Sequence, residues 1–322
     1  GKYAVEINPV ITPLPRNRVG VSFDIFEGDL AKIKEINIVG NEDIKTSTLL
    51  NQMELTTSGI MTWYTGTDKY SREKLEGDLE RIRTYYLDRG YLEFHVEPPQ
   101  VSISPDRKEI YITITVDEGE PYEVNKVQLA GDLLGLQEQI EELITVQEGD
   151  TFSAAKTNET VTSITDYLGS LGYGFANVNP QPILDRDNQQ TDLTFYVDPG
   201  RRVYVRRIEI GGNVRTRDEV IRREMRQQEA AWYDQGSINL SRDRIDRLGY
   251  FTEVDVHAEP VPGSPDQVDL VVDVKERPTG MINLGIGYGT TDKVMLSAGI
   301  SQDNIFGSGN SLSLQVNTSE TN

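Results

Sequence analysis

One order of sequence signals recurs along the chain, and it constrains the fold more than any other feature. Each complete copy opens with alternating apolar residues that end in glycine and an amide or acid, at Gly40-Asn41, Gly131-Asp132 and Gly212-Asn213. The copies repeat with a period of roughly 80 to 90 residues, which indicates tandem modules of one design.

Within each copy a short helical pattern precedes a longer one that ends at Gly-Tyr, as at Gly90-Tyr91. The longer helix of the first copy carries one apolar stripe, formed by Leu75, Leu79, Ile82 and Tyr86. Two strands then follow around turn residues such as Ser104-Pro105-Asp106. The order strand, helix, helix, strand, strand predicts an α+β module whose helices pack on a three-stranded sheet.

The repeats and the segments that flank them define five parts. Residues 1–28 supply only the last hairpin of an earlier copy, and residues 278–322 follow the last copy. In the third copy, Thr216 and Glu219 have capping-box spacing, so we expect its first helix to begin there. The predicted parts are 1–28, 29–118, 119–200, 201–277 and 278–322.

The C-terminal part alternates with the period of a strand rather than that of a helix. Apolar residues alternate with polar or small ones in three runs, of which Ile282–Gly289 is the first. This length and period suit the strands of a transmembrane β-barrel, although a half-buried sheet of a soluble domain has the same period. Three strands are too few to close a barrel, so we expect only its beginning.

Charge and motif content exclude several classes of function. The formal net charge of −20 would repel the phosphates of nucleic acid. No cysteine is present, and His95 and His257 lie one to a module, so exposed or satisfied histidines are favoured over a metal site. Acidic clusters such as Glu138, Glu141 and Glu142 read as a solvated helix face. We predict no catalytic residue, no metal and no cofactor.

The repeated β-α-α-β-β order, with Glu-Gly or Pro-Gly at each junction, resembles the POTRA modules of the BamA family. The third copy, with Arg222–Gln227 and the Pro262–Gln267 hairpin, is similar to the membrane-proximal module of that family. Asp303–Asn310 resembles the turn between the second and third strands of the family's barrel. In this register the parts are the end of the family's second module, its complete third, fourth and fifth modules, and the first barrel strands.

The resemblance implies a non-enzymatic central subunit of the machinery that assembles outer-membrane β-barrel proteins. Its POTRA modules would lie in the periplasm of a Gram-negative bacterium and receive unfolded clients, while the barrel lies in the outer membrane. Alternatives are a TamA-like relative, a two-partner secretion transporter, a structural spacer or adhesin-like module and, remotely, a hydrolase.

The resemblance also implies surfaces for clients and for BamB- and BamD-like accessory lipoproteins. The edge strand of the first complete copy would pair with a BamB-like propeller or a client, unless Pro98-Pro99 protect that edge. The first barrel strand would form one side of a seam that opens laterally, although its glycines could merely relieve crowding. The edge residues are Glu93, Phe94, His95, Val96, Val101 and Ile103, and the seam residues are Asn283, Leu284, Gly285, Ile286, Gly287, Tyr288 and Gly289.

The first helix of the third copy would dock a BamD-like lipoprotein. Residues 201–277 hold 14 basic and 15 acidic side chains, whereas the preceding 200 residues are strongly acidic. Val220, Ile221 and Met225 should face the module's own sheet. Local pairing with Asp218, Glu219 and Glu229 is the alternative for the arginines. The docking residues would be Arg222, Arg223, Glu224, Arg226 and Glu229.

Overall fold

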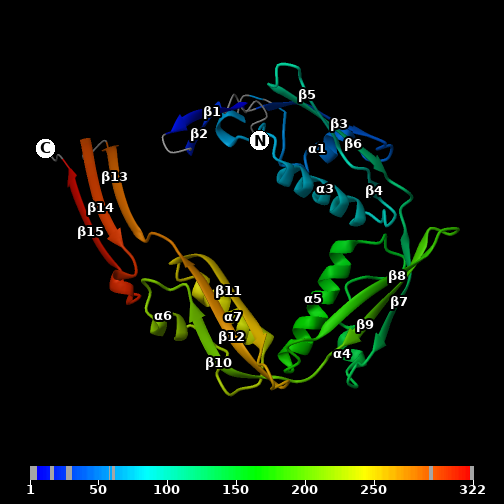
Figure 1. Cartoon of the computed structure of the whole chain (residues 1–322). Helices are drawn as coiled ribbons and strands as arrows, with labels where there is room; N and C mark the ends of the chain where they lie inside the picture. The colour runs from blue at the N-terminus through cyan, green and yellow to red at the C-terminus, as the bar shows by residue number, and fades with distance from the viewer. Residues whose placement is uncertain are drawn as a thin grey trace. The chain divides into compact units, whose positions relative to one another are not determined.

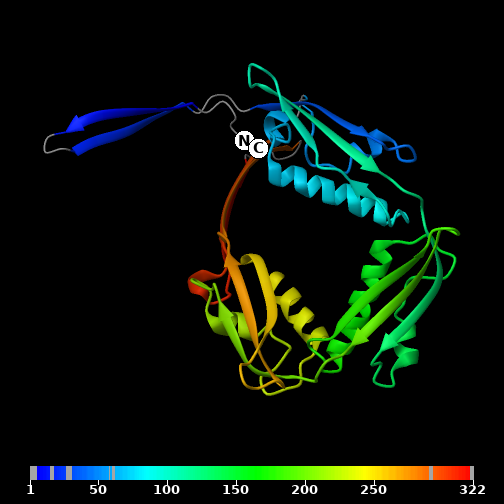
Figure 2. The ribbon, with the colours of Figure 1, turned by 45° about the vertical axis from the view of Figure 1, so that its right-hand side comes forward.

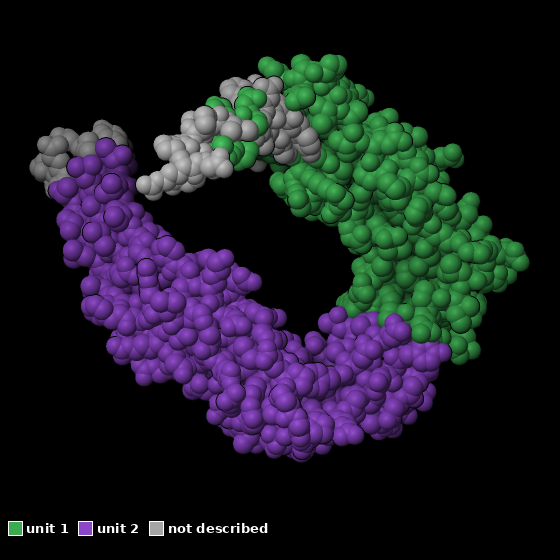
Figure 3. Space-filling model, in the orientation of Figure 1, with its two compact units in different colours: residues 1–128, 144–160, 180–194 green, residues 129–143, 161–179, 195–322 purple. Residues whose placement is uncertain are grey.

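The structure is a computed structural model that describes residues 6–14, 18–26, 31–57, 59, 62–289 and 293–319. The chain divides into two compact units (Figure 3). One comprises residues 1–128, 144–160 and 180–194, and the other comprises residues 129–143, 161–179 and 195–322. Near the N-terminus, β1 (Glu6–Leu14) pairs antiparallel with β2 (Arg18–Phe26).

The first complete module packs its helices on one face of a mixed sheet (Figures 1 and 2). The first strand, β3, runs parallel to the last strand, β6, and β4 and β5 pair antiparallel with the other side of β6. The elements are β3 (Lys32–Val39), α1 (Thr46–Leu50), α2 (Thr62–Thr65), α3 (Arg72–Leu87), β4 (His95–Val96), β5 (Gln100–Ile103) and β6 (Glu109–Asp117).

The two following modules have the predicted order and sheet. In each, the last strand of the module lies between the other two, in the orders β7-β9-β8 and β10-β12-β11. The elements of one are β7 (Glu123–Gly131), α4 (Gln137–Glu141), α5 (Ala154–Ser170), β8 (Asn177–Asp185) and β9 (Gln190–Asp198). Those of the other are β10 (Tyr204–Gly211), α6 (Asp218–Arg222), α7 (Gln235–Asp246), β11 (Phe251–Pro260) and β12 (Gln267–Glu276).

The C-terminal part is a three-stranded antiparallel sheet in the order β13-β14-β15. Ile282 pairs with Ile300, which pairs with Leu314, so apolar side chains form rows across one face. The elements are β13 (Gly280–Gly289), β14 (Lys293–Gln302), the 3-10 turn η1 (Ile305–Gly307) and β15 (Leu312–Ser319). Strands therefore lie where the alternating runs predicted them, and Asp303–Asn310 connects β14 to β15.

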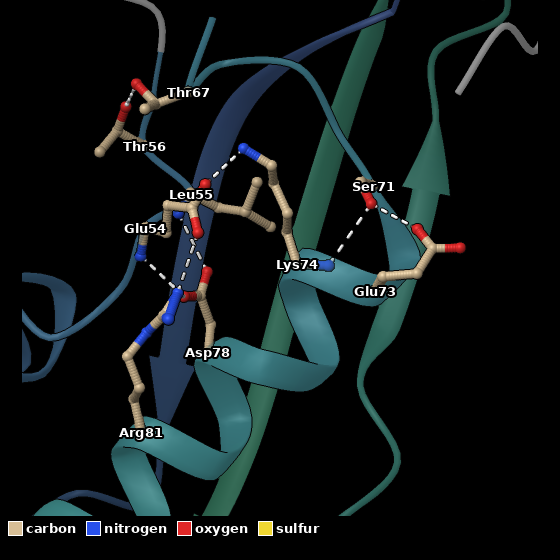
Figure 4. A network of polar contacts seen from close by, with 9 residues as sticks. All are labelled: Glu54, Leu55, Thr56, Thr67, Ser71, Glu73, Lys74, Asp78 and Arg81. Atoms are coloured by element: carbon tan, nitrogen blue, oxygen red, sulfur yellow. Dashed lines mark hydrogen bonds and ion pairs between the residues drawn. The ribbon is translucent and has the colours of Figure 1, made fainter. Parts of the chain in front are cut away.

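One charged residue interrupts the apolar stripe of α3. Leu75, Ile82 and Tyr86 are buried, but Leu79 is only partly buried, and Asp78 is fully buried on this helix. The Asp78 carboxylate accepts from the backbone N–H groups of Glu54 and Leu55, at 2.7 and 3.0 Å (Figure 4). A buried carboxylate needs such donors, and here they fasten Glu54 and Leu55, which precede α2, onto α3.

Candidate partner-binding surfaces

The helix α6 of the last module ends at Arg222, so most of the predicted docking residues lie after the helix rather than on it. Val220 and Ile221 are fully buried and Met225 nearly so, which confirms that these side chains face the module's own core. The predicted capping box is wrong, because Arg217 is the N-cap and makes no side-chain capping bond. Thr216 is buried instead, and its hydroxyl accepts a hydrogen bond from Asn304, far along the chain.

The arginines of this region are exposed but hold local partners. Arg222 pairs with Asp218 and Glu229, each at 3.3 Å, and donates to the carbonyl oxygen of Ile208 on β10. Glu229 accepts from the backbone N–H of Ile208 at 2.8 Å. These contacts fit the local-pairing alternative for Arg222 and tie the end of α6 to the sheet.

The other docking candidates differ in how far they are available to a partner. Arg226 donates to the backbone carbonyls of Arg223 and Met225, and both arginines are exposed. The Glu224 side chain is only 16% exposed and accepts from Arg244 on α7 at 2.8 Å. Arg223 and Arg226 are therefore better placed than Glu224 to meet a second protein.

The edge strand of the first complete module is broken and begins later than the sequence suggests. His95 and Val96 form β4, and Val101 and Ile103 lie in β5, where both are more than a third exposed. Pro98-Pro99 separate these two short strands, since proline has no N–H to donate to a ladder. Both strands pair with β6, and Val101 and Ile103 present their side chains to solvent at this edge.

Glu93 and Phe94 are not edge-strand residues, which corrects their assignment to this surface. Phe94 is buried and its ring stacks on Tyr86, with ring centroids 4.1 Å apart. Glu93 instead accepts from Arg186 at 2.6 Å and from the Tyr122 hydroxyl at 2.8 Å, both in the following module. The hydrogen bond from Arg186 lowers the pKa of Glu93 below its usual value.

Further contacts at this junction were not evident from the sequence. The Asp88 carboxylate, just after α3, accepts from the backbone N–H of Ala155 in the first turn of α5 at 2.7 Å. The carbonyl oxygen of Gly90 accepts from the N–H of Tyr122, and that of Gly172 accepts from the N–H of Val203. The Gly-Tyr signals, read from the sequence only as helix ends, therefore also join one module to the next.

The residues predicted to form the barrel seam lie on β13, which is an edge strand of its sheet. Leu284 and Ile286 are about four-fifths exposed, and Asn283, Gly285 and Gly287 alternate with them. At Gly285 an added Cβ would lie 2.5 Å from the hydroxyl of Ser297, which supports relief of crowding at that position. Tyr288 and Gly289 also lie on β13, but the Tyr288 side chain is outside the described residues.

Metal ligands do not gather anywhere in the part of the chain that the structure describes. His95 is exposed at the edge, and His257 contacts Asp255 at 2.7 Å on the exposed face of β11. None of the described helices is long and apolar enough to cross a membrane.

Comparisons with known proteins agree with the repeated architecture. The POTRA family model, described as a surface antigen variable number repeat, matches residues 31–119, 122–200 and 203–277. The outer membrane protein assembly factor BamA of Neisseria meningitidis is 36% identical over 322 residues, which are 100% of this chain and 40% of that protein. BamA of Buchnera aphidicola is 32% identical over 302 residues, which are 93% of this chain and 49% of that protein.

Solved structures show the same modules. POTRA3-5 of Haemophilus influenzae BamA matches with a TM-score of 0.69 and 34% identity, covering 77% of this chain and 97% of that one. BamA from Haemophilus ducreyi lacking POTRA domains 1-3 matches with a TM-score of 0.54 and 36% identity, covering 62% and 37%. These matches confirm the resemblance and the tandem α+β modules. The chain belongs to the POTRA family, because the family model matches most of the length of the chain.

Proposed function

We propose that this chain is part of the central, non-enzymatic subunit of the machinery that assembles outer-membrane β-barrel proteins. The observation that carries the proposal is the direct passage from three POTRA modules into a sheet with an exposed apolar face. Leu284, Ile286 and Leu314 on that face are 81%, 79% and 68% exposed. A contiguous apolar face of this kind requires lipid or protein to cover it.

Several features of the C-terminal sheet support a place in the outer membrane. β13 and β14 are ten residues long, which matches the length that a tilted strand needs to cross the hydrocarbon layer. Two related proteins carry the name outer membrane protein assembly factor. We infer that 280–319 begins a transmembrane barrel and that the POTRA modules lie in the periplasm.

The proposed mechanism is templating through main-chain hydrogen bonds. An exposed strand edge presents N–H and C=O groups that an extended client segment can pair with, whatever its side chains. Edges at β5 and β13 would supply such templates. No covalent chemistry is required, so the function needs neither a catalytic residue nor a cofactor.

Depletion of the full-length protein tests this function against its alternatives. A general loss of outer-membrane barrel proteins is the expected result. Loss of one exported client would instead indicate a TamA-like or two-partner secretion role, and retention of every client would indicate a structural spacer.

We propose that the exposed arginines beside α6 dock a BamD-like lipoprotein. Arg226→Glu should weaken binding of purified BamD by about 1 kcal/mol or more, because reversal replaces an attraction with a repulsion at the interface. The Arg226 guanidinium donates to the backbone carbonyls of Arg223 and Met225, so its reversal leaves the ion pairs of Arg222 and Glu224 in place. Titration calorimetry gives the affinity.

The control for this docking surface is Arg242→Glu, an equally charged change at an exposed residue on α7. It should leave the affinity unchanged. A compensating reversal on BamD should restore binding to the Arg226 variant. Equal affinities for the wild type and for folded Arg226→Glu, Glu224→Arg and Glu229→Arg variants would refute docking at this surface.

We propose that β5 pairs with a BamB-like propeller or a client segment. Val101→Pro should abolish capture of BamB, because proline removes one N–H from this strand. Val101→Ala keeps the N–H and should capture BamB as the wild type does. Capture by a folded Val101→Pro variant would mean that this edge is not the binding strand.

We propose that β13 forms one side of a seam that opens during client insertion. One cysteine on β13 and one on the last strand of the full-length barrel should allow assembly when reduced and block it when cross-linked. Assembly assays on reduced and oxidised membranes measure this. Undiminished activity of the cross-linked protein would exclude opening at this seam.

A further inference from the structure

The turn between β14 and β15 is hydrogen-bonded to the last POTRA module. The backbone N–H of Arg217 donates to the carbonyl oxygen of Gly307 at 3.0 Å. The Asn304 amide donates to Thr216 Oγ1 at 2.7 Å, and the Tyr250 hydroxyl donates to the carbonyl oxygen of Gly309 at 3.2 Å. The turn, drawn in red beside α6 in Figure 1, thus contacts the module through both backbone and side-chain atoms.

Gly307 sets how closely the turn approaches the module. Its φ of +69° lies in the left-handed region, and an added Cβ would lie 1.9 Å from the carbonyl oxygen of Arg215 and 2.9 Å from its carbonyl carbon. These are backbone atoms of a loop that is itself hydrogen-bonded, so no side chain fits here unless the turn or the loop moves.

The loop that receives the turn differs from its counterpart in the first complete module. Asn41 and Asn213 play the same part in the two loops, since their amides donate to the carbonyl oxygens of Ile44 and Thr216. Ile44 packs against the core of its own module. At the equivalent position in the last module, the hydroxyl of Thr216 accepts the hydrogen bond from the turn. Of these two modules, the last one therefore has a side-chain hydrogen-bond acceptor at this position and the first has an apolar side chain.

The linker between the module and the sheet is held by hydrogen bonds at the residues before and after Pro278. Arg277 donates to the carbonyl oxygens of Tyr250 and Gly249, within the module. Thr279 donates to the carbonyl oxygen of Asp303 and accepts from its N–H, within the sheet. Pro278 lies between Arg277 and Thr279 and is the pivot between the module and the sheet. The turn is a second attachment of the sheet to the module.

We propose that Asp303–Asn310 is a latch that holds the C-terminal sheet on the module 203–277 and couples it to the start of α6. A movement that separates the turn from Thr216, Arg217 and Tyr250 releases the latch and leaves the pivot at Pro278. The latch does not depend on the identity of any partner or client, so it stands apart from the proposed function.

Amide hydrogen exchange in the full-length protein tests the latch. Gly307→Ala should speed exchange at the N–H of Arg217 by about tenfold or more, because that N–H loses its acceptor. The N–H of Tyr233, which donates to Val203 in the same module, should exchange at the wild-type rate. Gly263→Ala is the control, since Gly263 also has a positive φ of +81° but an added Cβ there meets no atom within 4 Å.

A second variant keeps the test decisive if Gly307→Ala does not fold. Thr216→Val preserves the volume of the side chain and removes the hydroxyl that accepts from Asn304. It should speed exchange at Arg217 several-fold and leave Tyr233 unchanged. Wild-type exchange at Arg217 in either folded variant, or an equal increase at Tyr233 and Arg217, would overturn the latch.

Discussion

Replacement of Gly212 by alanine is expected to lower the free energy of unfolding of the last module by about 3 kcal/mol or more. Gly212 follows β10 with a φ of +79°, and an added Cβ would lie 1.9 Å from the carbonyl oxygen of Val274 on the neighbouring strand. Left-handed backbone costs an alanine about 1–2 kcal/mol. Relief of the overlap by shifting paired strands costs about 1–3 kcal/mol more.

Tryptophan fluorescence during urea unfolding measures this loss in the last module. The chain has two tryptophans, so a Trp63→Phe background leaves Trp232 as the only reporter. Gly263→Ala is the matched control, because that glycine shares the backbone conformation and has open space around it. Its loss should be about 1–2 kcal/mol, the cost of the left-handed backbone alone. Equal losses in the two variants would contradict the proposed contact with Val274.

The glycines that mark the repeat show how far sequence reasoning reaches. Their regular spacing predicted the modules, and each has the same role in the structure. An added Cβ at Gly40 would lie 2.0 Å from the carbonyl oxygen of Val116, and one at Gly131 would lie 2.2 Å from that of Val197. Each contacted carbonyl belongs to the last strand of the module, about 60 to 75 residues along the chain from the glycine. The close approach therefore depends on tertiary packing, which the local sequence around the glycine does not show.

The candidate surfaces were less predictable because competing contacts are non-local. The periodicity of α3 placed its buried face correctly, but it could not reveal that Asp78 accepts from the backbone N–H groups of Glu54 and Leu55. Glu93 has the local pattern of an edge strand, yet Arg186 of the next module draws it into a junction. Thr216 and Glu219 have capping-box spacing, but Thr216 is committed to Asn304 instead.

Glu118 should be the most costly carboxylate to neutralise in the first complete module. It is 5% exposed, and its two oxygens accept from the backbone N–H groups of Glu42, Asp43 and Ile44 and from the Tyr86 hydroxyl. Glu118→Gln places an amide donor among these donors, so we expect a loss of about 3 kcal/mol. Hydrogen exchange of the α3 amides measures the loss, and Glu120→Gln, at an exposed neighbour, is the control.

The cost of Glu118→Gln should also depend on pH. Burial alone would raise the pKa of Glu118, but the hydrogen bonds from Asp43, Tyr86 and their neighbours outweigh it and lower the pKa below the usual 4.5. A depressed pKa in the folded state stabilises the module fully above about pH 4.5 and loses that effect as the pH falls through the folded value. The free energies of unfolding of the wild type and of Glu118→Gln should therefore converge as the pH falls below about 4.5. A difference that stays constant over this range would show that Glu118 contributes through packing rather than through its charge.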